Sequence, residues 1–213
     1  MIIAIDGPAG SGKSAVGKRV AVQLGLRFVD SGLMYRAIAC LAQDRGLELR
    51  AGAELARLAH QVEIELKGSQ VWAGGVDLTT RVYAPELSEA ASKVGKIAGV
   101  RLALVAQLRR LGRGGVVMAG RDVGTVIFPD TSHKFFLTAS IEERVRRRML
   151  QITERGEPAD PTELAREVRE RDRRDSERSV SPMRMAEDAS RIETDHLSVE
   201  EVAAEVLRQI AND

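Results

Sequence analysis

The sequence has a single cysteine, Cys40, and its three histidines are spread along the chain. One cysteine excludes an internal disulfide and fits a protein of a reducing compartment. Because cysteine and histidine do not cluster, we expect no zinc site. Cys40 lies in an apolar run, which favours a buried structural thiol over a nucleophile.

Aromatic residues make up only 3% of the chain, and the formal net charge is only +1. So few aromatics argue against a stacking platform for nucleic acid, and near-neutrality gives no general attraction to nucleic acid or membranes. No apolar run is long enough to span a bilayer, and the chain starts directly with a strand pattern, so we expect no signal peptide. We therefore expect a soluble cytoplasmic protein, and a monomer.

One stretch predicts that a nucleoside triphosphate binds. Residues 7–14, Gly-Pro-Ala-Gly-Ser-Gly-Lys-Ser, match the P-loop pattern and lie between an apolar strand pattern at residues 2–5 and an amphipathic helix pattern. The glycines let backbone N–H groups point inward, and the helix start adds positive partial charge. Lys13 is expected to reach the β- and γ-phosphates, and the Ser14 hydroxyl to help hold Mg²⁺.

Apolar strand patterns alternate with helical patterns along most of the chain. This alternation predicts a parallel sheet of about five strands with helices on both faces. A stricter alternation between residues 62 and 78, with glycine turns, predicts a small antiparallel meander inserted in that sheet fold. The expected strands of the main sheet are residues 2–5, 27–29, 115–119, 134–137 and 191–194.

Two more polar signatures follow predicted strands directly, at residues 30–32 and 120–122. The carboxyl ends of parallel strands share one edge, so both should face the P-loop across a cleft. A charged pair such as Arg121 and Asp122 is costly there unless it meets a ligand, which favours a functional role over a structural ion pair. For Asp-Ser-Gly at residues 30–32 with Arg36, a helix cap and a solvated arginine remain slightly favoured over a second phosphate site.

Eleven arginines lie between Arg144 and Arg178. Arg171, Asp175 and Arg178 are spaced four and then three residues apart, which puts them on one helix face. Such a stripe is more often an ion-pair network than a site. The stripe follows a helix-breaking segment that looks like a mobile lid. Phosphoryl transfer depends on the stabilisation of phosphate charge, which the guanidinium groups of a lid could supply.

Taken together, these stretches resemble bacterial cytidylate kinases, which are part of the nucleoside monophosphate kinase group. The resemblance covers essentially the whole chain, and the P-loop is its least specific part. It is carried by residues 3–14, by residues 30–32 with 35–36, by residues 91–92 with 100–101, by residues 120–129 and by residues 170–182.

The resemblance implies one α/β domain of the P-loop three-layer fold over residues 1–213. Residues 62–98 would be a monophosphate-binding insertion and residues 151–161 a lid. It implies a phosphotransferase that uses ATP and Mg²⁺ and converts CMP or dCMP into CDP or dCDP. The residues expected to bind ATP are Gly7, Pro8, Ala9, Gly10, Ser11, Gly12, Lys13, Ser14 and Ala15, with Ser14 also at the metal.

The resemblance also assigns the acceptor site. Lys13, Arg171 and Arg178 would be catalytic, with Arg178 approaching the triphosphate when the lid closes. Asp175, with Arg171, would hold the sugar hydroxyls. The α-phosphate of CMP would be held by Arg36, Arg121 and Arg171. The monophosphate site would be lined by Ser31 and Tyr35. The cytosine would be read by Ser92, Arg101 and Asp122.

Two alternatives stay open from the sequence. The first is a kinase for another small acceptor, such as a different nucleotide. The second is a P-loop switch protein that binds nucleotide and signals. The arginine-rich segment after the lid argues against a switch, as does the absence of an Asn-Lys-x-Asp guanine-reading motif.

Overall fold

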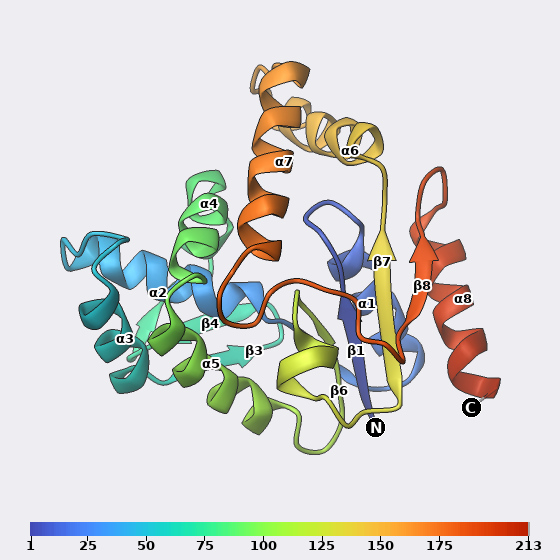
Figure 1. Ribbon diagram of the computed structural model, residues 1–213, viewed down its shortest axis with the longest axis horizontal. Coiled ribbons are helices and arrows are strands. Elements are labelled where there is room, and N and C mark those ends of the chain that lie inside the picture. Colours follow the sequence, from blue (N-terminus) through green and yellow to red (C-terminus); the bar gives the residue numbers. More distant parts are fainter. Residues whose placement is uncertain (213) are drawn as a thin grey trace.

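A computed structural model describes residues 1–212 of the chain. A twisted parallel sheet forms the centre of the molecule. Its five strands have the order β2-β6-β1-β7-β8 and are all parallel (Figure 1). The predicted five-stranded parallel sheet is therefore confirmed. The strands are β1 (Ile2–Asp6), β2 (Arg27–Asp30), β6 (Val116–Ala119), β7 (His133–Thr138) and β8 (Ser190–Glu193).

Helices cover both faces of this sheet, as the alternation of strands and helices predicts. Side chains of successive strand residues point to opposite faces, so Ile3 and Ile5 pack on one face and Ala4 on the other. The Ile3 face is covered by α1 (Lys13–Gln23) and α8 (Val199–Asn212). The Ala4 face is covered by helices that include α2 (Gly32–Asp44) and α5 (Ala98–Leu111).

A small antiparallel sheet lies beside the main one, where the sequence predicts a meander. Its strands are β3 (Ile64–Lys67), β4 (Gln70–Ala73) and β5 (Val76–Asp77), in that order. The side chain of Gln107 joins it to α5 by accepting from Ile64 N at 3.0 Å and donating to Val62 O at 2.9 Å. Helix α2 packs against β4, and the elements that flank this sheet along the chain are α3 (Gly52–Gln61), the short η1 (Arg81–Tyr83) and α4 (Pro85–Val94).

Two helices form an arm that projects beyond the carboxyl ends of the strands, α6 (Ile141–Thr153) and α7 (Pro161–Ser176) (Figure 1). Each starts at a side-chain cap: Ser140 Oγ accepts from Glu143 N at 3.2 Å, and Asp160 Oδ1 accepts from Thr162 N at 2.8 Å. A small apolar cluster of Val145, Leu164 and Val168 holds the two helices together.

One element that the sequence pattern does not predict is a π-helical turn, η2 (Val123–Ile127), directly after β6. Five residues are too few for a helical period to be read from them. The turn begins immediately after Gly120-Arg121-Asp122, so it determines how these residues face the cleft.

No helix within residues 1–212 has both the length and the apolar character needed to cross a membrane.

Candidate active site

The P-loop joins β1 to α1 and leaves backbone donors free. Gly10 and Gly12 have φ of 80° and 90°, a left-handed conformation that glycine adopts without strain. A Cβ atom on Gly7 would lie 2.0 Å from the carbonyl oxygen of Leu137, so only glycine fits there. Gly12 caps α1 without a side-chain hydrogen bond, so the first N–H groups of the helix remain available to an anion.

Lys13 lies inside the loop with only 6% of its surface exposed. Its ammonium donates to the carbonyl oxygen of Pro8 and, at 3.3 Å, to the hydroxyl of Ser11. Burial and then the nearby Arg121 guanidinium lower the pKa of Lys13, while Asp30 acts in the opposite direction. Since no carboxylate within residues 1–212 is hydrogen-bonded to Lys13, its positive charge is best satisfied by a bound phosphate.

The Ser14 hydroxyl has a carboxylate beside it. Ser14 Oγ donates to Asp30 Oδ2 at 2.8 Å, and Asp30 Oδ1 accepts from Gly32 N at 2.9 Å. Hydroxyl and carboxylate oxygens suit Mg²⁺, which usually binds one or two protein groups together with substrate phosphates and water. Within residues 1–212 no cluster of three or more His, Cys, Asp or Glu could hold a metal by itself, which fits such a shared site.

Across the cleft, Arg101 and Asp122 form a buried ion pair whose side chains are 2% and 4% exposed. Arg101 Nη1 also donates to Gly95 O at 3.1 Å, and the guanidinium lies 5.2 Å from the centre of the Tyr35 ring. Burial lowers the pKa of Arg101, but Tyr35 and Asp122 outweigh it and the pKa is raised. Burial raises the pKa of Tyr35 to about 12, so its hydroxyl keeps its proton.

Asp6, at the end of β1, holds the turn that carries Asp122. Its carboxylate accepts from Val123 N at 2.9 Å and from Gly124 N at 2.7 Å, so it caps η2 from across the sheet. Asp6 is only 5% exposed, and burial raises its pKa to about 6, against the opposing effect of these two hydrogen bonds. The strand that enters the P-loop is thereby linked to the segment predicted to read the base.

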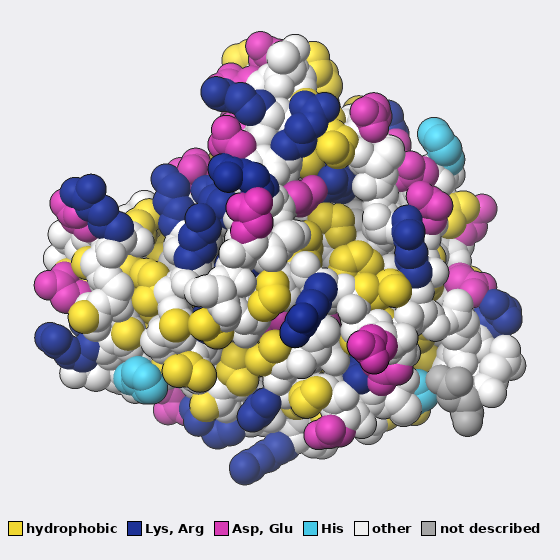
Figure 2. Space-filling model, in the orientation of Figure 1, with side chains coloured by type: hydrophobic (Ala, Val, Ile, Leu, Met, Phe, Trp, Pro, Cys, Tyr) yellow, Lys and Arg dark blue, Asp and Glu magenta, His cyan; other side chains and the backbone are white. Residues whose placement is uncertain are grey.

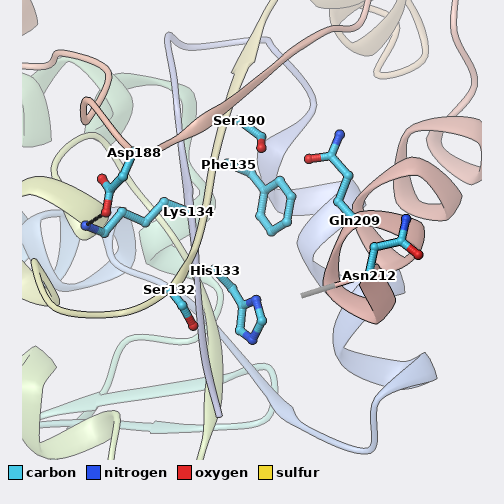
Figure 3. A pocket seen from close by; sticks show the side chains of 8 residues that line it. All are labelled: Ser132, His133, Lys134, Phe135, Asp188, Ser190, Gln209 and Asn212. Carbon is cyan, nitrogen blue, oxygen red and sulfur yellow. Dashed lines mark hydrogen bonds and ion pairs between the residues drawn. The ribbon is translucent and has the colours of Figure 1, made fainter.

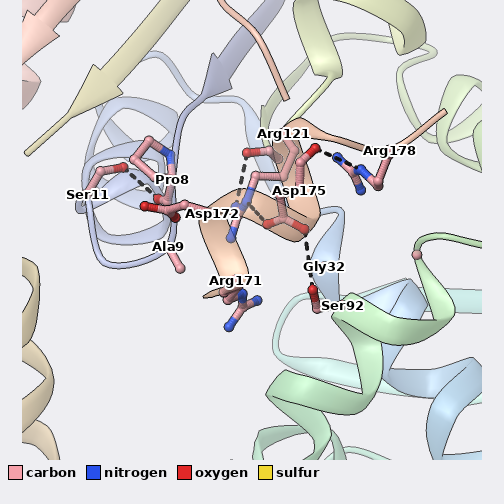
Figure 4. A network of polar contacts seen from close by, with 12 residues as sticks. Pro8, Ala9, Ser11, Gly32, Ser92, Arg121, Arg171, Asp172, Asp175 and Arg178 are labelled. Carbon is pink, nitrogen blue, oxygen red and sulfur yellow. Dashed lines mark hydrogen bonds and ion pairs between the residues drawn. The ribbon is translucent and has the colours of Figure 1, made fainter. Parts of the chain in front are cut away.

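A second buried carboxylate, Asp175 of α7, organises the next group (Figure 4). Arg121 Nε pairs with Asp175 Oδ2 at 3.0 Å, and Ser92 Oγ donates to Asp175 Oδ1 at 3.4 Å. Burial acts to raise the pKa of Asp175, but Arg121 and Arg171 outweigh it and the pKa is lowered. Asp175 is therefore a charged acceptor at this position.

Arg36 and Arg171 complete the positive side of the cleft. Arg36 Nη1 donates to Val82 O at 3.2 Å, and Arg171 Nη1 donates to Ser88 Oγ at 2.7 Å. Burial and then Arg121 lower the pKa of Arg171 to about 10. Because Arg121 and Arg171 also lower the pKa of Lys13, the acceptor arginines and the donor lysine lie in one electrostatic field.

Arg178 lies on the acceptor side of the cleft in this structure, and its approach to the triphosphate on lid closure stays a prediction. Arg178 is 9% exposed, and its Nε donates to Asp175 O at 3.1 Å. Its Nη1 lies beside Gly95, 3.6 Å from where a Cβ atom would be if Gly95 had one. Burial and then Arg101 lower its pKa. In this structure Arg178 thus lies beside the predicted base-reading residues.

Beside Arg178 the surface is hollowed and basic. Lysine and arginine side chains gather where α7 meets α4 (Figure 2). The hollow here has a volume of about 300 Å³, and it is lined by Lys96, Arg173, Arg174, Glu177, Arg178 and Ser179.

Two arginines of α6 contact the outside of the P-loop, which the sequence did not single out. Arg144 Nη1 donates to Ala9 O at 3.3 Å and pairs with Asp172 at 2.6 Å. Arg147 Nη1 donates to Gly10 O at 3.2 Å, and Nη2 donates to Thr194 O at 2.5 Å. The arm is therefore joined directly to the loop.

The structure brings the predicted site residues to the carboxyl ends of β1, β2 and β6, or to helices that face them. Ser31 lies against Gly120, where a Cβ would come within 2.6 Å of its hydroxyl. The side chain of Ala15 is exposed, so only its backbone could face a phosphate. The sequence missed Asp6, Ser88, Arg144 and Arg147; Asp6 follows a strand directly and could have been found by that rule.

A separate polar hollow lies at the amino end of β7, away from the P-loop (Figure 3). It measures about 260 Å³. Lys134 at its edge pairs with Asp188 at 2.6 Å. Since the predicted residues lie at the opposite ends of the strands, this hollow is not the candidate active site. Its lining consists of Ser132, His133, Lys134, Phe135, Asp188, Ser190, Gln209 and Asn212.

Comparison with known proteins agrees with this geometry. The family described as cytidylate kinase matches residues 3–212. A bifunctional pantoate ligase/cytidylate kinase of a Synechococcus species is 46% identical over 97% of the chain, and one of a Nostoc species is 44% identical over 97%. The chain spans about 40% of the length of these two relatives.

Solved structures support the fold. A gluconokinase from Sinorhizobium meliloti matches with a TM-score of 0.50 and 14% identity, over 99% of this chain and 91% of its own. An uncharacterized protein from Eubacterium ventriosum matches with a TM-score of 0.55 and 13% identity, over 100% of this chain and 99% of its own.

Proposed function

Since the chain belongs to the cytidylate kinase family, we propose that it transfers the γ-phosphate of ATP to CMP or dCMP. The products are ADP and CDP or dCDP. ATP, with Mg²⁺, occupies the P-loop, and the monophosphate occupies the cleft between α4, α7 and the segment after β6.

The observation that carries the proposal is the buried pair of Arg101 and Asp122 beneath the acceptor side of the cleft. Cytosine carries an amino group that needs an acceptor, and a ring nitrogen and carbonyl that need donors. A carboxylate and a guanidinium, with the Ser92 hydroxyl nearby, supply this pattern. Uracil has a carbonyl in place of the amino group. Its carbonyl oxygen would lie against the carboxylate of Asp122, and since both groups only accept hydrogen bonds, uracil would bind more weakly.

The reaction needs little acid or base catalysis from the protein. An oxygen of the acceptor phosphate, already ionised near neutral pH, attacks the γ-phosphorus, and the bond from that phosphorus to the β-phosphate oxygen breaks. Lys13 stabilises charge on the β- and γ-phosphates, while Arg36, Arg121 and Arg171 hold the acceptor phosphate in line. Ser14, beside Asp30, would hold Mg²⁺, which neutralises charge on the β- and γ-phosphates when bound.

The arm formed by α6 and α7 excludes water from this transfer. It carries Arg171 on one helix, and Arg144 and Arg147 of the other contact the loop. If the arm closes over both nucleotides, the triphosphate is shielded from hydrolysis.

A coupled assay of ADP release over AMP, CMP, dCMP, UMP and GMP tests the proposal. We expect CMP and dCMP to be phosphorylated with kcat/KM at least roughly 100-fold above the purine monophosphates, because binding to a polar site rejects bases that leave its groups unpaired. Faster turnover of another monophosphate would replace cytidylate as the acceptor.

The substitution Asp122→Ala tests the reading of the base. We expect the KM for CMP to rise roughly 10- to 100-fold, because a hydrogen bond to a charged group is lost and Arg101 loses its partner. The KM for ATP should change less than about threefold, since Asp122 does not face the P-loop phosphates. An equal change in both constants would argue that Asp122 has only a structural role.

A further inference from the structure

Ser88 lies at a point where three helices meet, and nothing in the sequence singles it out. It is on α4 and only 7% exposed. Its hydroxyl oxygen accepts from Arg171 Nη1 of α7 at 2.7 Å and from Arg36 Nη2 of α2 at 3.5 Å. One neutral oxygen is thus shared by two guanidinium groups.

The same two helices are joined by a second contact with the same spacing. Ser92 lies four residues after Ser88 on α4, and Asp175 lies four residues after Arg171 on α7. Ser92 Oγ donates to Asp175 Oδ1 at 3.4 Å. Because residues four apart share a helix face, these contacts form two parallel links between α4 and α7. Ser88 therefore sets the position of Arg171 relative to Asp175.

Asp30 and Asp175 lie near enough to act on the charges of Arg36 and Arg171, but neither forms a direct ion pair with them. Among residues 1–212, the ion pairs include neither Arg36 nor Arg171, and the buried Nε of Arg171 has no hydrogen-bond partner. A hydroxyl offers hydrogen bonds but no charge. Two guanidinium groups held around one neutral oxygen fit a dianionic phosphate in front of them.

We propose that Ser88 is a positioning residue of the acceptor-phosphate site. Its hydroxyl holds Arg36 and Arg171 in place before the monophosphate arrives, so that less side-chain freedom is lost on binding. The identity of this anion as the phosphate of CMP rests on the proposed function.

Steady-state kinetics of Ser88→Ala and Ser88→Thr test the proposal. We expect Ser88→Ala to raise the KM for CMP about tenfold, the effect of losing a hydrogen bond to a charged group, with the KM for ATP changed less than about twofold. Ser88→Thr keeps the hydroxyl and should restore most of the wild-type KM. An unchanged KM for CMP in Ser88→Ala, or equal changes in both constants, would overturn the proposal.

Thr79→Val is a matched control. Thr79 Oγ1 accepts from Val71 N at 3.0 Å in the meander, so this variant also removes one hydroxyl that supports the acceptor-side insertion. It should leave the KM for CMP unchanged.

Thermal unfolding in inorganic phosphate separates this proposal from the proposed function. Phosphate should raise the unfolding midpoint of the wild type and of Ser88→Thr more than that of Ser88→Ala. If the wild type does not phosphorylate CMP but this difference is found, the proposed function fails and the role of Ser88 stands. If phosphate shifts all three proteins equally, Ser88 does not position the arginines.

Discussion

At the scale of single residues, the buried amino group of Lys13 donates, within residues 1–212, to a carbonyl and a hydroxyl oxygen and to no carboxylate. The substitution Lys13→Met should lower kcat roughly 1,000-fold, because a charged donor to the transferring phosphate is lost. The midpoint of thermal unfolding should stay the same or rise, because no ammonium group has to be desolvated on folding. Kinetics and calorimetry on one preparation check both parts.

The exposed Lys18, on the same helix, supplies the control. Lys18→Met should leave both kcat and the unfolding midpoint near their wild-type values. If Lys13→Met keeps near-normal turnover, the lysine has no role at the phosphates.

Asp6 should make the stability of the protein depend on pH. Its pKa is raised to about 6 in the folded state, so the folded protein binds this proton more tightly than the unfolded chain does. Stability from this group is therefore present below about pH 4 and is lost as the pH rises through about 6. Relative to Asp6→Asn, the wild-type free energy of unfolding should fall by about 2.4 kcal/mol between about pH 4 and about pH 7.

Urea unfolding of both proteins over this pH range measures the difference. Carboxylates common to both proteins cancel, so the change isolates Asp6. A wild type that gains stability relative to the variant would show that the N–H donors and Lys13 outweigh burial.

The residues that the sequence predicted are those whose chemistry is local. Lys13 and Ser14 follow from one motif, and Asp122 from its place directly after a strand. Ser88 could not be found this way, because its importance comes from the packing of α4 against α7. Its partner Arg171 lies 83 positions away in the sequence, and no local pattern carries that information.

At the scale of elements, α7 should unfold locally more easily than the sheet. It contributes only three buried side chains, Leu164, Val168 and Asp175. The substitution Asp160→Ala removes its N-cap, which contributes about 1 kcal/mol. Amide hydrogen exchange in the first turns of α7 should then be about fivefold faster, since opening becomes easier by that amount.

Ser198→Ala is the matched control, because Ser198 caps α8 by accepting from Glu201 N at 3.2 Å. Its effect should be confined to α8, on the far side of the sheet from the cleft. If Asp160→Ala accelerates exchange throughout the molecule, the arm is not a separate opening unit.

Helix starts can be recognised in a sequence because caps are local signals: Ser140 and Asp160 each cap an N–H only two or three residues further along the chain. The turn η2 could not be recognised in this way, because its cap is the carboxylate of Asp6, 117 positions before Val123. A cap that comes from another strand leaves no trace near the element that it stabilises.

For the whole molecule, the net charge of +1 hides a strongly positive cleft. Arg36, Arg171 and Lys13 lie close together where the strands end. Arg171 lowers the pKa of Lys13, and Arg36 lowers the pKa of Arg171. Inorganic phosphate at about ten times its Kd should therefore stabilise the protein by about 1.4 kcal/mol, which raises the unfolding midpoint by about 3 °C. Sodium chloride at the same ionic strength should raise the midpoint less. Equal shifts would mean that phosphate acts only by screening the repulsion between the positive side chains, without binding.

The overall arrangement was predictable in outline, because alternating strands and helices allow few topologies. The contacts of the arm with the P-loop were not, since they join segments about 135 residues apart. The division into an insertion at residues 62–98 and a lid at residues 151–161 stays a prediction, as does a cytoplasmic monomer.

The burial of Cys40 has a practical consequence for measuring motion in this protein. The thiol is 1% exposed, and burial raises its pKa, so it reacts poorly with maleimides. A cysteine introduced at the exposed Glu157, between α6 and α7, and a second at the exposed Ser69, between β3 and β4, could therefore carry a pair of fluorescent dyes while the native thiol is left in place. Energy transfer between the dyes would then report the distance from the arm to the small sheet as each nucleotide is added.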